Sequence, residues 1–130
     1  MEAISNLWLG FSVATSGLNI LYCLVGVTMG MIVGVMPGLG PVAGTAILVP
    51  VTFGMDATSA IIMLAGIYYD SQYGGTITSV LINTPGESAS VITCIDGYAM
   101  AKRGRAGTAL GVAAIGSFVG GTAAIVGLTF

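Results

Sequence analysis

Apolar residues run along this chain in long blocks, and a few polar clusters mark where the blocks end. No charged residue occurs between residues 3 and 55. As one helix this stretch would measure about 80 Å, whereas the hydrocarbon core of a bilayer is about 30 Å thick. The stretch must therefore turn back, and the prolines and glycines of MPGLGP at residues 36–41 supply the turn. Residues 17–36 before it predict one membrane-spanning helix.

The blocks after this turn are shorter and less regular. Residues 42–55 are too few for a full span and predict a half-helix, a re-entrant segment, or the start of a helix kinked at Pro50. We expect residues 42–69 to span with breaks, residues 71–86 to form a re-entrant or broken segment, and residues 107–130 to span again. The pattern predicts an all-α integral membrane fold with several spans and discontinuous or re-entrant helices.

Composition supports this membrane fold and excludes several classes of soluble protein. Charged residues make up 6% of the chain and apolar residues 55%, with a mean hydropathy of +1.01, whereas soluble domains carry about 25% charged residues. Three basic residues and a net charge of −2 are too few for the phosphate contacts of a nucleic-acid-binding protein. The chain has no His, and its two Cys lie far apart. Neither a metal site nor a disulfide framework is therefore predicted.

The basic residues lie together and predict the orientation of one loop. They are Lys102, Arg103 and Arg105, and the positive-inside rule places their loop in the cytoplasm. We expect a cytoplasmic-side helix and loop over about residues 87–106, with Gly104 as the helix C-cap and an outward-running helix after it. Because the chain stops inside an apolar run, we expect it to be a piece of a longer protein.

Glycines recur at every fourth position in the first predicted span. Four of them would lie on one helix face and let a neighbouring helix approach closely: Gly26, Gly30, Gly34 and Gly38. Tight packing inside one multi-span protein explains such a face best, and a seam between two copies of the chain is the alternative. The same spacing recurs in the last block, at Gly107/Gly111 and Gly116/Gly120.

The turn after the first span contains GLGPVA, which has the letters of a dinucleotide fingerprint without its context. That fingerprint follows a strand in a βαβ unit, whereas here an apolar helix precedes it. A break in a membrane helix is the better interpretation, with a plain extramembrane turn as the alternative. In transporters such breaks leave backbone groups free to face anionic substrates or to hold cations. The candidate substrate-binding residues here are Pro37, Gly38, Gly40 and Pro41.

The densest group of polar side chains lies in YYDSQYGGTITSVLINTPGES, residues 68–88. An ionisable residue between apolar blocks is a functional candidate, and NTPG at residues 83–86 predicts a second helix break. Hydroxyl and amide groups here can ligate a carboxylate or Na⁺, although an interfacial loop with Tyr anchors is the alternative. The substrate-binding candidates are Tyr73, Gly74, Gly75, Thr76, Asn83, Thr84, Pro85, Gly86 and Ser88. The coupling-ion candidates are Asp70, Asn83 and Thr84.

Enzyme chemistry is not expected from this sequence. Without His, neither a Ser–His nor a Cys–His pair can form. Tyr69-Asp70 resembles half of an intramembrane aspartyl protease site, but the partner GxGD sequence is absent. No GxxxxGK[ST] loop for ATP is present either. We therefore predict no catalytic residue and no cofactor apart from a coupling Na⁺ or H⁺.

Two long segments of the chain resemble a known family. They are GVMPGLGPVAGTAILVPVTFGMD and AGIYYDSQYGGTITSVLINTPGESASVITCIDGYAMAKRGRAGTALG. They resemble the large membrane subunit of tripartite tricarboxylate transporters, the TctA family, and the resemblance extends from about residue 8 to residue 130. The family usually has Pro where this chain has Ala99, and often a small residue where it has Asp70.

The resemblance implies a multi-pass permease of the bacterial inner membrane with two related halves. Residues 1–130 would form the N-terminal part of its transmembrane domain. The implied activity is secondary uptake of tricarboxylates or related carboxylates, driven by a Na⁺ or H⁺ gradient. The implied partners are a small TctB-like membrane subunit and a periplasmic TctC-like substrate-binding protein. From the residues alone, a non-transporting scaffold or assembly subunit packed through its glycine faces stays the alternative.

Overall fold

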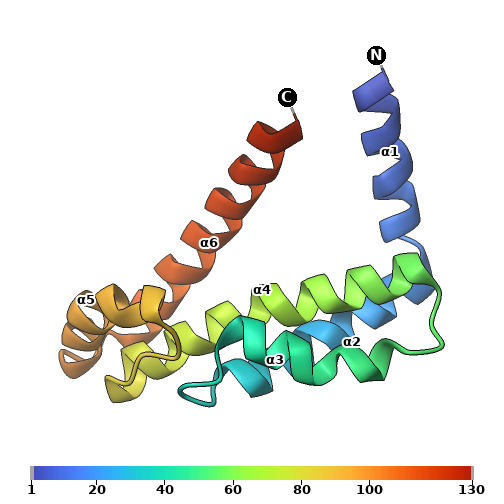
Figure 1. Cartoon of the computed structure of the whole chain (residues 1–130). Coiled ribbons are helices and arrows are strands. Elements are labelled where there is room, and N and C mark those ends of the chain that lie inside the picture. The colour runs from blue at the N-terminus through green and yellow to red at the C-terminus, as the bar shows by residue number, and fades with distance from the viewer. Residues whose placement is uncertain (1, 130) are drawn as a thin grey trace.

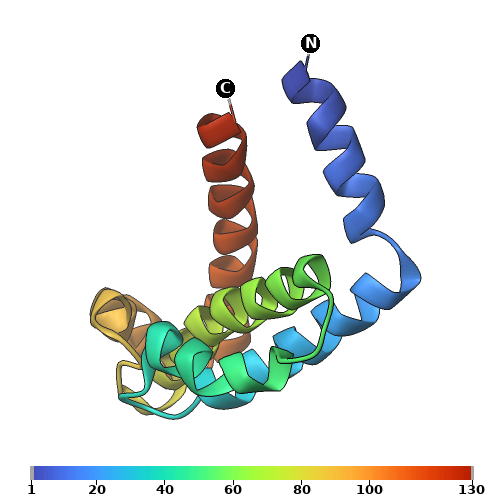
Figure 2. The same ribbon diagram turned by 45° about the vertical axis from the view of Figure 1, so that its right-hand side comes forward.

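The computed structural model describes residues 2–129, and every regular element in this range is a helix. The α-helices are α1 (Glu2–Ala14), α2 (Gly17–Gly34), α3 (Gly40–Leu48), α4 (Ala57–Ile82), α5 (Val91–Lys102) and α6 (Ala106–Thr129). Two short 3₁₀ helices are η1 (Val49–Thr52) and η2 (Ser88–Ser90). α2, α3 and α4 pack side by side, and α1 and α6 project from the same side of this group (Figures 1 and 2). The predicted all-helical fold is confirmed for the described range.

The chain reverses direction twice between α2 and α4. Gly38 in the first turn has φ 91°, a left-handed conformation that glycine adopts without strain. α3 and η1 then return alongside α2 (Figure 1). A second turn at Gly54 (φ 87°) leads to Asp56, whose carboxylate accepts a hydrogen bond from the Thr58 N–H (3.1 Å) and caps α4. Residues 42–69 are thus interrupted at this turn and cap, which separate two oppositely directed helices.

α2 and α4 run parallel and in contact, and glycines set their spacing. Three glycines of α2 lie against the backbone of α4: Gly26 against Met63, Gly30 against Ile67, and Gly34 against Ser71. A Cβ added at Gly30 would lie 2.5 Å from the carbonyl oxygen of Ile67, so only glycine permits this approach. The glycine face is therefore an internal packing surface. Gly38, also predicted on this face, lies beyond the end of α2.

α4 continues without a break through the polar stretch that contains Asp70. The hydroxyls of Thr78 and Ser79 donate to the carbonyl oxygen of Gly75 within the helix (3.0 and 2.7 Å). These polar residues therefore satisfy their hydrogen bonds locally and leave the helix intact. The helix persists almost to the NTPG sequence, so the break in the predicted re-entrant or broken segment of residues 71–86 lies at that sequence.

The segment after α4 forms the predicted helix, tight turn and long apolar helix. Gly104 (φ 76°) lies just beyond the end of α5, as a C-terminal glycine should, and α6 begins two residues later. A Cβ added at Gly97 would lie 2.8 Å from a methyl carbon of Val80. This close approach packs α5 against the C-terminal end of α4 (Figure 1).

One buried polar pair joins the beginnings of α2 and α4 to the end of α1. The Ser59 hydroxyl of α4 donates to the Asn19 side-chain oxygen of α2 (2.6 Å). The Asn19 amide in turn donates to the carbonyl oxygen of Val13 near the end of α1 (2.9 Å). Asn19 and Ser59 are each 6% exposed, so each group depends on the other for its hydrogen bond.

The distribution of buried and exposed side chains is the reverse of that in a soluble protein. The buried residues are mostly small or polar, with Met63, Ile67, Val80 and Ala109 as the buried apolar ones. Large apolar side chains such as Trp8, Phe53 and Phe118 are at least 75% exposed. α2 and α6 are long and apolar enough to cross a membrane. Such a surface requires lipid or further protein around it.

Candidate functional site

The two predicted helix breaks lie next to each other. The first is the loop of residues 35–39 between α2 and α3, and the second is the loop of residues 83–87 between α4 and η2. The N–H of Gly38 in the first loop donates to the carbonyl oxygen of Gly86 in the second (3.4 Å). α3 begins directly after the first loop, and the N–H groups of its first turn, apart from Pro41, which has none, lack a partner within the helix.

Glycine-to-glycine contacts hold the second loop against α2 and α4. A Cβ added at Gly75 would lie 3.3 Å from the Cα of Gly86, and one at Gly86 would lie 3.4 Å from the carbonyl oxygen of Gly34. A Cβ at Gly86 would overlap Gly75. Close backbone packing therefore accounts for these glycines. Their predicted role in substrate binding stays a prediction.

Asn83 ends α4 in the left-handed region of backbone space, with φ 56° and ψ 30°. Its N–H and the N–H of Thr84 both donate to the carbonyl oxygen of Thr78, the second at 3.4 Å. Asn adopts this conformation more readily than most residues, so the backbone geometry explains its presence. The Asn83 side chain is exposed, which leaves its amide accessible to a ligand.

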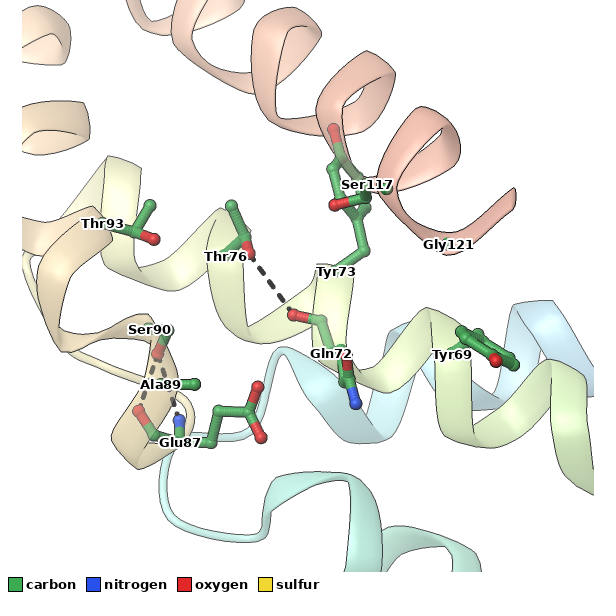
Figure 3. Close-up of a pocket in the computed structure, with 11 residues that line it drawn as sticks. Tyr69, Gln72, Tyr73, Thr76, Glu87, Ala89, Ser90, Thr93, Ser117 and Gly121 are labelled. Carbon is green, nitrogen blue, oxygen red and sulfur yellow. Dashed lines mark hydrogen bonds between the residues drawn. The ribbon is translucent and has the colours of Figure 1, made fainter. Parts of the chain in front are cut away.

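A polar cavity of about 320 Å³ opens between α4, the η2–α5 segment and α6. Its lining includes Tyr69, Gln72, Tyr73 and Thr76 from α4, Glu87 and Ser90 from the second loop and η2, Thr93 from α5, and Ser117 from α6. The Glu87 carboxylate points into this space toward the Gln72 side chain (Figure 3). Glu87 is the one charged residue among the described residues that line it.

Two of the predicted substrate-binding residues, Tyr73 and Thr76, line this cavity. The Tyr73 hydroxyl donates to the carbonyl oxygen of Leu110 (3.1 Å) and connects α4 to α6 at the cavity edge. The Thr76 hydroxyl donates to the carbonyl oxygen of Gln72 (3.4 Å), as drawn in Figure 3. Both hydroxyls thus have backbone partners and keep accepting capacity for a ligand.

The prediction from sequence missed most of this cavity, namely Tyr69, Gln72, Glu87, Ser90, Thr93 and Ser117. A usable pattern was present, because the four lining residues of α4 follow the i, i+3, i+4, i+7 spacing of one helix face. The expected helix boundary at Asp70 concealed that spacing. The contribution of α6, through Ser117 and two glycines, has no local sequence pattern.

Asp70, the predicted coupling-ion residue, lines a second cavity of about 420 Å³. This cavity shares Tyr69, Tyr73 and Ser117 with the polar cavity, and its remaining lining is apolar: Val27, Met31, Ala114 and Phe118. The Oδ2 atom of Asp70 is buried and has no hydrogen-bond partner among the described residues. A buried carboxylate oxygen without a partner is uncommon and marks a functional candidate in a membrane protein.

The three predicted ion ligands are not gathered at one place. Asp70 lies in the middle of α4, whereas Asn83 and Thr84 follow its last residue, about 20 Å farther along at 1.5 Å per residue. The other predicted residues lie at or near the two loops. Pro37, Pro85 and Ser88 are exposed there, Pro41 is buried in the first turn of α3, and Gly40 has φ 64°.

Similarity to known proteins indicates the family in which these loops and cavities occur. The model described as the tripartite tricarboxylate transporter TctA family matches residues 20–130 of this chain. The chain belongs to the TctA family. It is also 56% identical over 124 residues to an Agrobacterium vitis protein described as an uncharacterized 52.8 kDa protein in the TAR-I ttuC' 3' region. The match covers 95% of this chain and 25% of that relative, so the chain spans about a quarter of the relative's length. No solved structure matches it.

Membership of the TctA family confirms the resemblance drawn from the two sequence segments. The matched range contains both loops and the lining of both cavities. TctA proteins form a family of transporters, and the two long apolar helices, α2 and α6, accord with a membrane protein. The family does not favour the alternative of a non-transporting scaffold.

Proposed function

We propose that this chain forms the N-terminal part of the large permease subunit of a secondary transporter for tricarboxylates or related carboxylates. A periplasmic binding protein of TctC type delivers the substrate, and a small membrane subunit of TctB type accompanies the permease. A Na⁺ or H⁺ gradient drives uptake. The description of the family as tripartite tricarboxylate transporters supports this proposal.

We further propose a multi-pass location in the bacterial inner membrane, with the turn between α5 and α6 on the cytoplasmic side. All three basic residues of the chain lie at residues 102–105, in or beside this turn. The positive-inside rule favours that orientation. α6, which is exposed and apolar along its length, then crosses the membrane outward.

The contact between the two loops is the observation that carries the proposal. A carboxylate in a membrane requires positive potential, and no basic residue lies near these loops in the sequence. Backbone N–H groups at helix starts and in broken segments supply such potential without a charged side chain. The hydrogen bond from Gly38 to Gly86 gathers two such segments into one surface.

The test of this function is carboxylate uptake by the complete transporter. The full permease, the small subunit and the binding protein are reconstituted in liposomes, with radiolabelled citrate as the probe. We expect accumulation only with the binding protein present and with an imposed Na⁺ or H⁺ gradient. Correctly inserted protein that accumulates no citrate or other di- or tricarboxylate under either gradient contradicts the proposal.

Asn83→Gly separates a ligand role of Asn83 from its backbone role. Glycine keeps the positive φ of 56° at no strain, so this variant removes the amide alone. If the amide binds the carboxylate, uptake is lost while the amount of permease in the membrane stays unchanged. Thr84→Val tests the neighbouring hydroxyl in the same way. Normal uptake by both variants removes the two residues from the site.

Asp70 keeps its proposed role as a coupling residue that takes up a cation or a proton. Support comes from its buried Oδ2 atom, which has no hydrogen-bond partner among the described residues. Asp70→Asn retains the shape of the side chain and removes its charge. We expect uptake by this variant to lose its dependence on the gradient. Unaltered ion dependence contradicts the role.

A further inference from the structure

The polar cavity holds one negative charge and many neutral oxygen atoms. Glu87 lines it together with the side chains of Gln72, Thr76, Thr93 and Ser117. Every Lys and Arg of this chain lies at residues 102–105, and none lines the cavity. A negative carboxylate entering this space is repelled by Glu87, whereas a hard cation finds the oxygen ligands that it prefers.

Hydrogen bonds with Ser90 and close packing against Gly40 hold the backbone of Glu87 beside the cavity. The Ser90 hydroxyl accepts a hydrogen bond from the N–H of Glu87 (3.2 Å) and donates to its carbonyl oxygen (2.9 Å). On the other side, a Cβ added at Gly40 would lie 4.0 Å from the Cβ of Glu87. The residue before Glu87, Gly86, accepts the hydrogen bond that joins the two loops. Glu87 therefore lies between the cavity and the loop contact.

We propose that this cavity is a binding site for Na⁺, held by the Glu87 carboxylate with oxygen atoms of Gln72, Thr76 and Thr93. The bound cation neutralises Glu87, so that a substrate carboxylate can bind at the adjacent loops. The inference deepens the proposed carboxylate transport and rests on it for the second step. A volume of about 320 Å³ leaves space for waters beside the ion, at about 30 Å³ each.

This arrangement couples the two ligands thermodynamically. If Na⁺ at Glu87 favours carboxylate binding by a given factor, the carboxylate favours Na⁺ binding by the same factor. Couplings between two sites are usually about 5- to 150-fold in affinity. We therefore expect the affinity of the permease for the carboxylate to rise by a factor in that range when Na⁺ is added.

The first experiment measures binding of radioactive Na⁺ to the purified full-length permease without any carboxylate. Wild type is compared with Glu87→Gln, with Asp70→Asn as the competing assignment, and with Asp96→Asn as the matched control. Asp96 is an exposed carboxylate on α5 that does not line the cavity. We expect Glu87→Gln to bind fewer Na⁺ ions per permease than wild type and Asp96→Asn to bind as many. Absence of Na⁺ binding in wild type, or equal Na⁺ binding in wild type and Glu87→Gln, overturns the inference, as does a loss in Asp70→Asn alone.

The second experiment measures citrate binding with and without Na⁺. Wild type should bind more tightly with Na⁺, whereas Glu87→Gln should bind citrate independently of Na⁺. Citrate binding by Glu87→Gln that still rises with Na⁺ as in wild type overturns the inference. If Na⁺ binds through Glu87 but no carboxylate is transported, the proposed function fails and the cation site stands. If carboxylate is transported and Na⁺ binding does not depend on Glu87, the proposed cation site is wrong and the proposed function is unaffected.

A second set of variants keeps the inference testable if Glu87→Gln does not insert into the membrane. Gln72→Leu and Thr76→Val each remove a neutral oxygen donor from the same cavity. We expect each to lower the affinity for Na⁺, and the double variant to lower it further. Wild-type Na⁺ affinity in the double variant overturns the inference.

Discussion

The α2–α4 pair and α6 use the same glycine spacing in opposite surroundings. On α2, Gly26, Gly30 and Gly34 lie so close to α4 that an added Cβ would meet its backbone. On α6, glycines recur at the same spacing, at Gly107/Gly111 and Gly116/Gly120, and an added Cβ at each has no atom of the described residues within 4 Å. α6 is held instead by contacts with α4 and α5 and by the Tyr73–Leu110 hydrogen bond.

The difference shows what a repeated glycine does and does not predict. The spacing makes a helix face flat enough for close approach, but it does not say which helix approaches. On α2 the partner follows in the same chain, because α3 and η1 return the chain so that α4 lies parallel beside it. On α6 the same face is open to lipid or to protein outside this chain.

The largest expected effect is that of Gly30→Val. The added atoms would meet the Ile67 backbone, which cannot rotate away as a side chain could. Overpacking of this kind costs about 1–3 kcal/mol, and rigid backbone favours the upper end. The measurement is thermal unfolding of the full-length permease in detergent. A melting temperature equal to that of wild type would show that α2 and α4 are farther apart than described.

Asn19→Ala is the next test, because it removes the polar link at the opposite end of the same helix pair. The Ser59 hydroxyl would be left buried without its acceptor, at a cost of about 1–3 kcal/mol. Asn6→Ala on the exposed α1 is the matched control and should change stability little. Equal melting temperatures for the two variants would show that the Asn19–Ser59 hydrogen bond does not stabilise the protein.

Tyr73→Phe tests the weaker attachment of α6. The variant removes the hydrogen bond to Leu110, worth about 0.5–1.5 kcal/mol, and leaves the ring in place. We expect faster hydrogen exchange in the first turns of α6 and little change in α2. Tyr69→Phe is the control, because the Tyr69 hydroxyl has no hydrogen bond to α6 within residues 2–129. Unchanged exchange in Tyr73→Phe would show that other contacts hold α6.

Gly111→Val should have the smallest effect. Open space surrounds this position in the chain described here, so the free energy of unfolding should change by no more than about 0.5 kcal/mol. The measurement is the melting temperature of Gly111→Val, compared with those of Gly30→Val and wild type. A loss as large as that of Gly30→Val would show that another helix of the complete permease packs on α6 at this glycine face.

Much of the fold could be predicted from the sequence because membrane helices are delimited by local patterns. The span before Pro37, the Gly104 cap and the glycine face of α2 all depend on a few neighbouring residues. The break expected at Asp70 was wrong for a physical reason. Hydroxyl and glycine residues satisfy their hydrogen bonds inside α4, so a polar composition did not require a helix boundary.

The candidate site was only partly predictable, since it combines local and distant contributions. The loops at Gly38 and Gly86 could be identified from their Pro-Gly sequences, but their contact depends on how α3 returns the chain. The polar cavity was mostly missed, because Thr93 and Ser117 come from α5 and α6. Tertiary packing alone brings those hydroxyls opposite the α4 face.

The contact between the two loops is the central claim, and citrate uptake by Gly86→Ala tests it most directly. A single Cβ at Gly86 would overlap Gly75 and push the loops apart. Displacing a binding group by 1 Å can cost roughly a hundredfold in rate. Gly10→Ala is the control, since Gly10 lies within helix α1 and an added Cβ there would have no atom of the described residues within 4 Å. We predict that Gly86→Ala reaches the membrane and loses uptake while Gly10→Ala retains it. Wild-type uptake by Gly86→Ala would contradict the account.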